Sequence, residues 1–205
     1  MSIEILTAPA NDAVSLAEYK SHVRVEDSDS DSDLTIKIEA AIKIFERLTN
    51  RALITQTVIQ KFDKFPCERN FLLERTPVQS ITTVKYYDQD NTLTTFDSAN
   101  YSTSGLNTTP RIFLKKSKEW PTDAHLDRPD AVEVTYICGE GDESTDVSQE
   151  YRHAIMTMAG DFMNFREDSL AAPGLTIQSL PLNSQRIISL FKYNFYEWAS
   201  QSRKS

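Results

Sequence analysis

The sequence predicts an α+β protein: a helical scaffold, with two N-terminal helices and one long C-terminal helix, carries an inserted small antiparallel β module and ends in an aromatic tail. Two observations predict this class. Apolar residues recur at helical spacing in 34–48 and again in 151–165, near the two ends of the chain. Between them, residues 51–138 are rich in Thr, Val, Ile, Tyr and Phe and are divided by turn residues, which is typical of short strands.

The domain organisation follows from the same patterns. We expect residues 1–50 together with 139–181 to form the helical scaffold, 51–138 to form the inserted β module, and 182–205 to form a C-terminal helix or arm. The tail is expected to carry a contact surface, because a solvated terminus does not need so many aromatic side chains.

Two helices are expected before residue 50. Ser15 is a candidate N-cap, and Glu18 follows three residues later, which is the capping-box spacing. After an acidic loop, a second helix presents one apolar stripe and should end at Asn50. The residues of that stripe are Leu34, Ile38, Ala41, Phe45 and Leu48.

About six short strands are expected in the β module. The clearest is 132–136, where apolar residues alternate with Glu133 and Thr135, as in a half-buried strand. Gly139 and Gly141 then interrupt the strand pattern, and a helical stripe of about five turns follows. That stripe consists of Ser148, Tyr151, Ile155, Met158, Phe162 and Phe165.

The formal net charge is −8, and the acidic residues are concentrated in the flanks of the chain. Residues 1–50 hold 5 basic and 10 acidic groups, whereas residues 51–138 hold 11 of each. A surface of this charge repels phosphate, so sequence-specific DNA binding is not expected. No segment has the apolar length of a membrane span, and residues 1–9 do not resemble a signal peptide, so we expect synthesis and retention in a cytoplasm.

Motifs for catalysis, cofactors and metals are not found in the sequence. Five glycines supply neither a P-loop nor a dinucleotide-binding fingerprint, and no nucleophile elbow occurs. The three histidines, His22, His125 and His153, lack zinc-ligand spacing, and Cys67 and Cys138 are read as buried small apolar residues. We therefore expect no catalytic residue, cofactor or metal, although a carboxylate pair assembled from distant positions stays open.

Two charged clusters have a functional and a structural interpretation. The alternating aspartates from Asp27 resemble the start of a calcium loop, but Ser32 replaces the required glycine and Ile38 the required glutamate, so a solvated acidic loop is favoured. A basic cluster lies beside Trp120, and it could bind nucleic acid or protect an exposed strand edge; we favour edge protection. The cluster consists of Arg111, Lys115, Lys116 and Lys118.

Five segments of the sequence resemble, in the same order, segments of the head-tail connector (adaptor) proteins of tailed phages. The resemblance extends from about residue 14 to residue 190, and no single segment is diagnostic by itself. The segments are 14–18 (VSLAE), 50–57 (NRALITQT), 77–81 (PVQSI), 131–136 (AVEVTY) and 152–156 (RHAIM).

The resemblance implies a structural virion protein of the neck, made in the host cytoplasm, with no enzymatic activity, no cofactor and no membrane contact. Such adaptors form a ring of about twelve copies on the portal protein. Stopper or tail-completion proteins attach to the other side, and DNA passes through the lumen without specific binding.

Two sets of residues become candidate sites in that setting. The tail is expected to dock on the portal, because aromatic side chains supply large buried areas at interfaces. Its residues are Arg186, Phe191, Lys192, Tyr193, Phe195, Tyr196 and Trp198. The acidic loop is expected to face the lumen and repel DNA, and its residues are Glu26, Asp27, Asp29, Asp31 and Asp33.

Two other functions remain open at this stage. One is a stopper or tail-completion protein of the same neck. The other is a virion hydrolase or carbohydrate-binding module, which the β module could carry.

Overall fold

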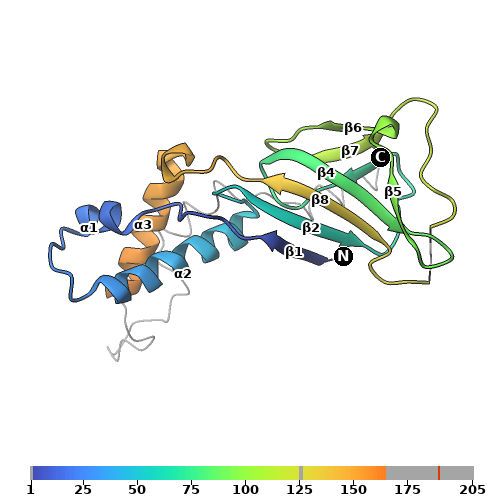
Figure 1. Ribbon diagram of the computed structural model, residues 1–205. Helices are drawn as coiled ribbons and strands as arrows, with labels where there is room; N and C mark the ends of the chain where they lie inside the picture. Colours follow the sequence, from blue (N-terminus) through green and yellow to red (C-terminus); the bar gives the residue numbers. More distant parts are fainter. Residues whose placement is uncertain (1, 125–126, 165–188, 190–205) are drawn as a thin grey trace, which may run out of the picture.

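A computed structural model of the chain describes residues 2–124, 127–164 and 189. Its three helices gather at one end of the molecule, and two antiparallel sheets form the other end (Figure 1). The N-terminal segment begins beside the sheets and runs toward the helices (Figure 1). In the described part of the chain, no helix is long and apolar enough to cross a membrane.

The three expected helices are confirmed, and their ends have local causes. Helix α1, Leu16–Val23, starts where the Ser15 hydroxyl accepts a hydrogen bond of 3.2 Å from the Glu18 N–H. Helix α2, Asp31–Thr49, ends because Asn50 adopts a left-handed conformation with φ 56°. Helix α3, Gln149–Asn164, packs against α2, and their facing side chains form the helical core.

The larger sheet has five strands in the order β1-β2-β8-β4-β5. These are β1 Ser2–Thr7, β2 Gln56–Phe62, β8 Val132–Cys138, β4 Val78–Tyr87 and β5 Leu93–Phe96. The smaller sheet has the order β3-β7-β6, formed by β3 Asn70–Leu72, β7 Arg111–Leu114 and β6 Tyr101–Ser104. The buried faces of both sheets contribute to one apolar core, with Val84 and Tyr136 from the larger sheet and Phe71 and Ile112 from the smaller one.

The prediction of a helical scaffold with a small inserted β module is wrong. Eight strands in two sheets contain as much of the chain as the helices do, and the sheets form a body of the molecule with a core of their own. Two strands were missed for physical reasons. β1 has only an edge position and exposes most of its side chains, and β3 has 3 residues, so neither produces an alternating pattern that a sequence reveals. The assignment of 1–50 with 139–181, 51–138 and 182–205 to separate units stays a prediction.

The helical core and the sheet core meet where three chain segments cross. The Ala52 N–H donates to the Thr76 carbonyl at 2.8 Å, and the Thr76 N–H donates back to Asn50 at 3.2 Å. The third segment joins when the Thr55 N–H donates to the Gly141 carbonyl at 2.9 Å. We call 50–55, 75–77 and 139–141 the junction. Because backbone hydrogen bonds link all three segments, the junction holds the helices at a fixed position on the sheets.

Gly139 is required at the junction. Its φ of 137° is rarely adopted by L side chains, and an added Cβ would lie 2.6 Å from the Thr55 Cα. The close approach of the two backbones therefore depends on this glycine.

Polar side chains complete the junction. The Arg75 guanidinium donates to the carbonyls of Glu46 and Arg51 at 3.1 and 3.2 Å. The Glu46 carboxylate accepts from the Leu53 N–H at 2.9 Å. Burial raises the pKa of Glu46, while the hydrogen bond from Leu53 and the charge of Arg75 act in the opposite direction.

Replacing Glu46→Gln should change how stability depends on pH. A carboxyl whose pKa is higher in the folded state stabilises the fold most below its unfolded pKa, and this contribution is lost as pH rises through the folded value. Glutamine keeps an oxygen acceptor for Leu53 but does not ionise. The free energy of unfolding of the variant, measured by urea titration, should therefore rise relative to the unsubstituted protein as pH increases from about 4.

The matched control is Glu39→Gln, at an exposed position of the same helix. It should show a much smaller pH-dependent difference. If the difference in free energy of unfolding between Glu46→Gln and the unsubstituted protein does not change from acidic to neutral pH, the pKa of Glu46 is not raised in the folded state.

Candidate functional site

The acidic loop between α1 and α2 is divided between helix contacts and solvent. The Lys20 ammonium donates to the Asp27 carbonyl and to the Asp31 carboxylate, both at 2.6 Å, and Asp33 pairs with Lys37. Asp31 and Asp33 lie in the first turn of α2, where the helix dipole favours negative charge. Glu26, Asp27 and Asp29 are exposed. Among the described residues no group of three or more potential ligands could hold a metal ion.

Helices α1 and α3 bring together side chains that are far apart in the sequence. Arg152 donates to the Glu18 carboxylate at 3.1 Å, and the rings of His22 and His153 meet edge to face at 5.9 Å. Both histidines are exposed. His125 lies outside the described residues.

The three lysines of the basic cluster lie in a hydrogen-bonded turn after β7, and Arg111 is the first residue of β7. The Arg69 guanidinium donates to the Lys115 carbonyl at 2.6 Å, and the Lys118 N–H donates to the same carbonyl at 3.1 Å. Trp120 anchors the far end of the turn, because its indole N–H donates to the Glu68 carbonyl at 2.8 Å and its ring stacks on Phe65. The side chains of Lys115, Lys116 and Lys118 are exposed around this turn.

The interpretation of these lysines as protection for a strand edge is wrong. β7 is the middle strand of its sheet, with β3 on one side and β6 on the other. The lysines therefore place positive charge at the surface of a chain whose flanks are acidic.

Among the described residues no strand pairs with the outer sides of β1 and β5 in the larger sheet, and both strands expose apolar side chains. On β1, Ile5 is 56% and Leu6 66% exposed, and on β5, Leu93 is 40% exposed. The sequence analysis predicts strands only within 51–138 and therefore does not find this surface. The signal that was available is the uncharged run of 5–10 in a chain whose first fifty residues are otherwise rich in charge.

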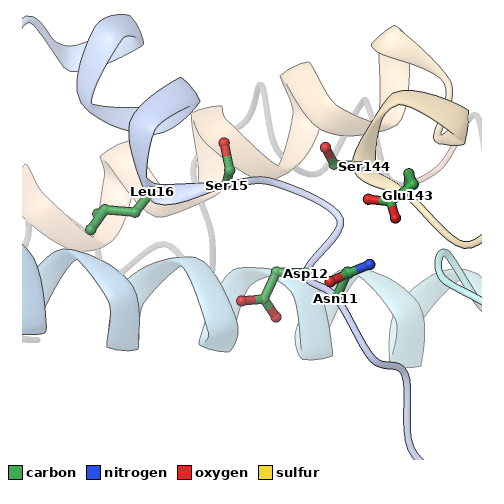
Figure 2. A pocket seen from close by; sticks show the side chains of 6 residues that line it. All are labelled: Asn11, Asp12, Ser15, Leu16, Glu143 and Ser144. Atoms are coloured by element: carbon green, nitrogen blue, oxygen red, sulfur yellow. The ribbon is translucent and has the colours of Figure 1, made fainter.

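A polar hollow of about 310 Å³ lies where the N-terminal segment meets the 143–144 turn. Figure 2 shows its side chains spread around the opening, without several of them converging on one point. Several of the groups already have structural partners: Ser15 caps α1, and the Asn11 amide donates to the Asp142 carbonyl at 3.1 Å. The hydrogen bonds around the hollow therefore serve to cap α1 and to hold the N-terminal segment against the loop at residue 142. It is lined by Asn11, Asp12, Ser15, Leu16, Glu143 and Ser144.

The predicted portal-docking residues lie outside the described residues. These are Arg186, Phe191, Lys192, Tyr193, Phe195, Tyr196 and Trp198. Their role stays a prediction, as does the orientation of the acidic loop toward a lumen.

The fold is shared with chains from the necks of gene transfer agent (GTA) particles. One solved neighbour is from the neck of an empty GTA particle, computed with C6 symmetry: the TM-score is 0.76, the identity 21%, and the match covers 94% of this chain and 95% of that one. A chain of the native GTA virion gives 0.75 at 20% identity, and a chain of the native neck, computed with C12 symmetry, gives 0.74 at 20%, both with the same coverage.

This likeness includes the helices as well as both sheets, and it confirms at the level of the fold the resemblance to neck proteins that the ordered sequence segments indicated. No protein-family model and no curated protein matches the chain.

The two cysteines should differ sharply in reactivity. The expectation that both cysteines are buried is wrong for Cys67, which is exposed. Cys138 is buried in the sheet core, where burial raises the pKa of its thiol to about 12. The thiolate is the reactive form. At pH 8 a thiol reagent should therefore label one cysteine per folded chain, detected by mass spectrometry, and Cys67→Ser should abolish the labelling.

Unfolding in urea should expose Cys138 and restore one labelled site in the Cys67→Ser variant. Equal labelling rates for both thiols in the native protein would contradict the burial of Cys138.

Proposed function

We propose that this chain is a structural, non-enzymatic subunit of the neck of a phage-like virion, and that it acts as a head-tail connector (adaptor). The observation that carries the proposal is the match to a chain in a GTA neck over 94% of this chain and 95% of that one. A likeness that covers both sheets and the helices favours a neck component over an isolated carbohydrate-binding or hydrolase module, which would resemble the neighbour only in part.

The finer proposal is a ring of about twelve copies on the portal, with stopper or tail-completion proteins on the opposite side and DNA in the lumen. Two features support it. The net charge of −8 suits a channel through which DNA moves without being held, because repeated acidic surfaces repel phosphate. The junction gives each copy one fixed shape, and a closed ring requires every subunit to meet its neighbours at the same angle.

Mixing the purified full-length chain with purified portal rings and imaging the product by electron microscopy tests this role. We expect one added layer with rotational symmetry on one side of the portal. The control is the portal imaged alone under the same conditions. A chain that adds no layer to portal, but binds a preformed connector layer instead, would support a stopper or tail-completion protein and contradict the adaptor role.

The proposed docking by the tail can be tested separately with two truncations. A chain that ends at Ser189 loses all five tail aromatics, whereas a chain that ends at Ala199 keeps them. If burial of these rings anchors the ring on the portal, the first truncation should weaken portal binding at least about tenfold, as for loss of an interface hot spot, while the second should bind normally.

Binding can be measured by co-sedimentation of each chain with portal rings. Equal binding of the chain that ends at Ser189 and the full-length chain would show that the tail is not the anchor.

A further inference from the structure

Exposed apolar side chains are concentrated at the two edges of the larger sheet. Of the four large hydrophobic residues exposed in the described part of the chain, Ile5 and Leu6 lie on β1 and Leu93 lies on β5. The fourth, Ile36, lies on α2 and is 66% exposed, as is Leu6. Exposed apolar groups at a sheet edge point to a covering partner, because the edge also offers unpaired backbone donors and acceptors.

β1 lacks most of the features that prevent edge strands from pairing with other chains. Its one charged residue, Glu4, is matched by Lys61 on β2, with the two groups 3.0 Å apart. No lysine or proline occurs within the strand. Leu6 is the additional residue of a β-bulge, because Ile5 pairs with Val58 and Thr7 with Thr57. The side chain of Leu6 is therefore left uncovered next to an open edge.

β1 and β5 are the two edges of one sheet, and they run in the same direction. Each neighbouring pair in the order β1-β2-β8-β4-β5 is antiparallel, so the first and fifth strands are parallel to each other. The chain therefore offers two different edges on opposite sides of the sheet. An interface between different patches of identical subunits repeats from copy to copy and can close into a ring.

We propose that β5 of one copy adds to β1 of the next copy in parallel orientation, so that the larger sheet continues from subunit to subunit. This inference rests on the proposed ring and identifies β1 and β5 as the strands through which neighbouring copies contact each other. A second copy is the occupant that fits, because each copy supplies both halves of the joint and covers the exposed leucines at both edges.

The strand registers indicate how neighbouring sheets must be displaced. Ser2 and Thr95 lie in the same row, since Ser2 pairs with Lys61, Lys61 with Glu133, Glu133 with Lys85, and Lys85 with Thr95. Without displacement, β5 would face only the beginning of β1. A displacement of two or four residues, roughly 7 or 13 Å, brings all of β5 beside β1.

An even displacement also keeps the correct side chains on the same face of the sheet. Thr95 lies on the outer face, because it is exposed and its neighbour Phe96 is buried. Glu4 lies on the outer face too, because Ile3 beside it packs against the sheet core. A displacement of two therefore places Thr95 near Glu4, and a displacement of four places Leu93 near Glu4 and Thr95 near Leu6. Successive displacements incline the strands to the ring axis, as shear does in a β-barrel.

Disulfide trapping tests the joint in the assembly that the full-length chain forms with portal rings. In a Cys67→Ser background, Glu4→Cys is combined with Leu93→Cys or with Thr95→Cys. Mild oxidation should give a ladder of dimers, trimers and larger species on a denaturing gel, because each copy carries both halves of the joint. Glu4→Cys alone should give no ladder, and neither should Glu4→Cys with Thr94→Cys, whose side chain lies on the opposite face.

Matched lysine substitutions provide a second readout. Leu6→Lys places a charge at the proposed joint, whereas Ile36→Lys makes the same change at an equally exposed position on α2. We expect Leu6→Lys to reduce the fraction of assembled rings at least tenfold, as counted in electron micrographs, and Ile36→Lys to leave it within twofold. Both changes are at exposed positions, and circular dichroism should show the same fold for both.

The outcomes separate the two proposals. If rings form on the portal but no ladder is trapped and the two lysine variants assemble alike, the edge-to-edge joint is wrong while the adaptor role stands. If the unsubstituted chain forms no ring with portal, both proposals fail. A ladder together with selective loss of rings in Leu6→Lys supports the joint.

Discussion

Arg75 and the backbone crossings of the junction determine how the helical end of the molecule sits on the sheets. Arg75 reaches the carbonyls of Glu46 and Arg51, where α2 ends and the path to β2 begins. Leu53 and Ile54 then point into the helical core, whereas Ala52 and Val58 belong to the sheet core. The same short segment is therefore buried on both sides. Two bodies joined in this way cannot rotate about a linker without exposing apolar surface and breaking backbone hydrogen bonds.

The sequence was sufficient for elements with a strong local signal. The helices could be predicted because Leu34, Ile38 and Phe45 recur on one face, and β8 because its buried residues alternate with partly buried ones. The junction could not be predicted, since its partners, such as Thr55 and Gly141, are far apart in the chain and meet through backbone atoms that carry no residue identity. The sheet edges were missed for the opposite reason, because exposed Ile5 and Leu6 give no burial pattern.

The surfaces of the subunit are chemically distinct. Acidic side chains lie at the α1–α2 loop, lysines lie at the turn after β7, and uncharged apolar side chains lie at the edges of the larger sheet. In the proposed ring this distribution allows different neighbours to be recognised by different chemistry. Charged groups at the two ends of a subunit favour the correct orientation of approach, and apolar contacts between copies are insensitive to salt. The apolar stripes of the helices are mainly buried in the helical core, so these surfaces are formed by loops and sheet edges.

The position of β8 has a consequence for synthesis. β8 lies between β2 and β4 in the larger sheet, yet of the strands in the described residues it is the last to leave the ribosome. Until residue 138 has emerged, β1 with β2 and β4 with β5 are two separate hairpin-like pairs without a common centre. The complete larger sheet therefore arises only after residue 138 has emerged. Before that point the inner edges of β2 and β4 are unpaired on the nascent chain, and unpaired strand edges are prone to aggregation.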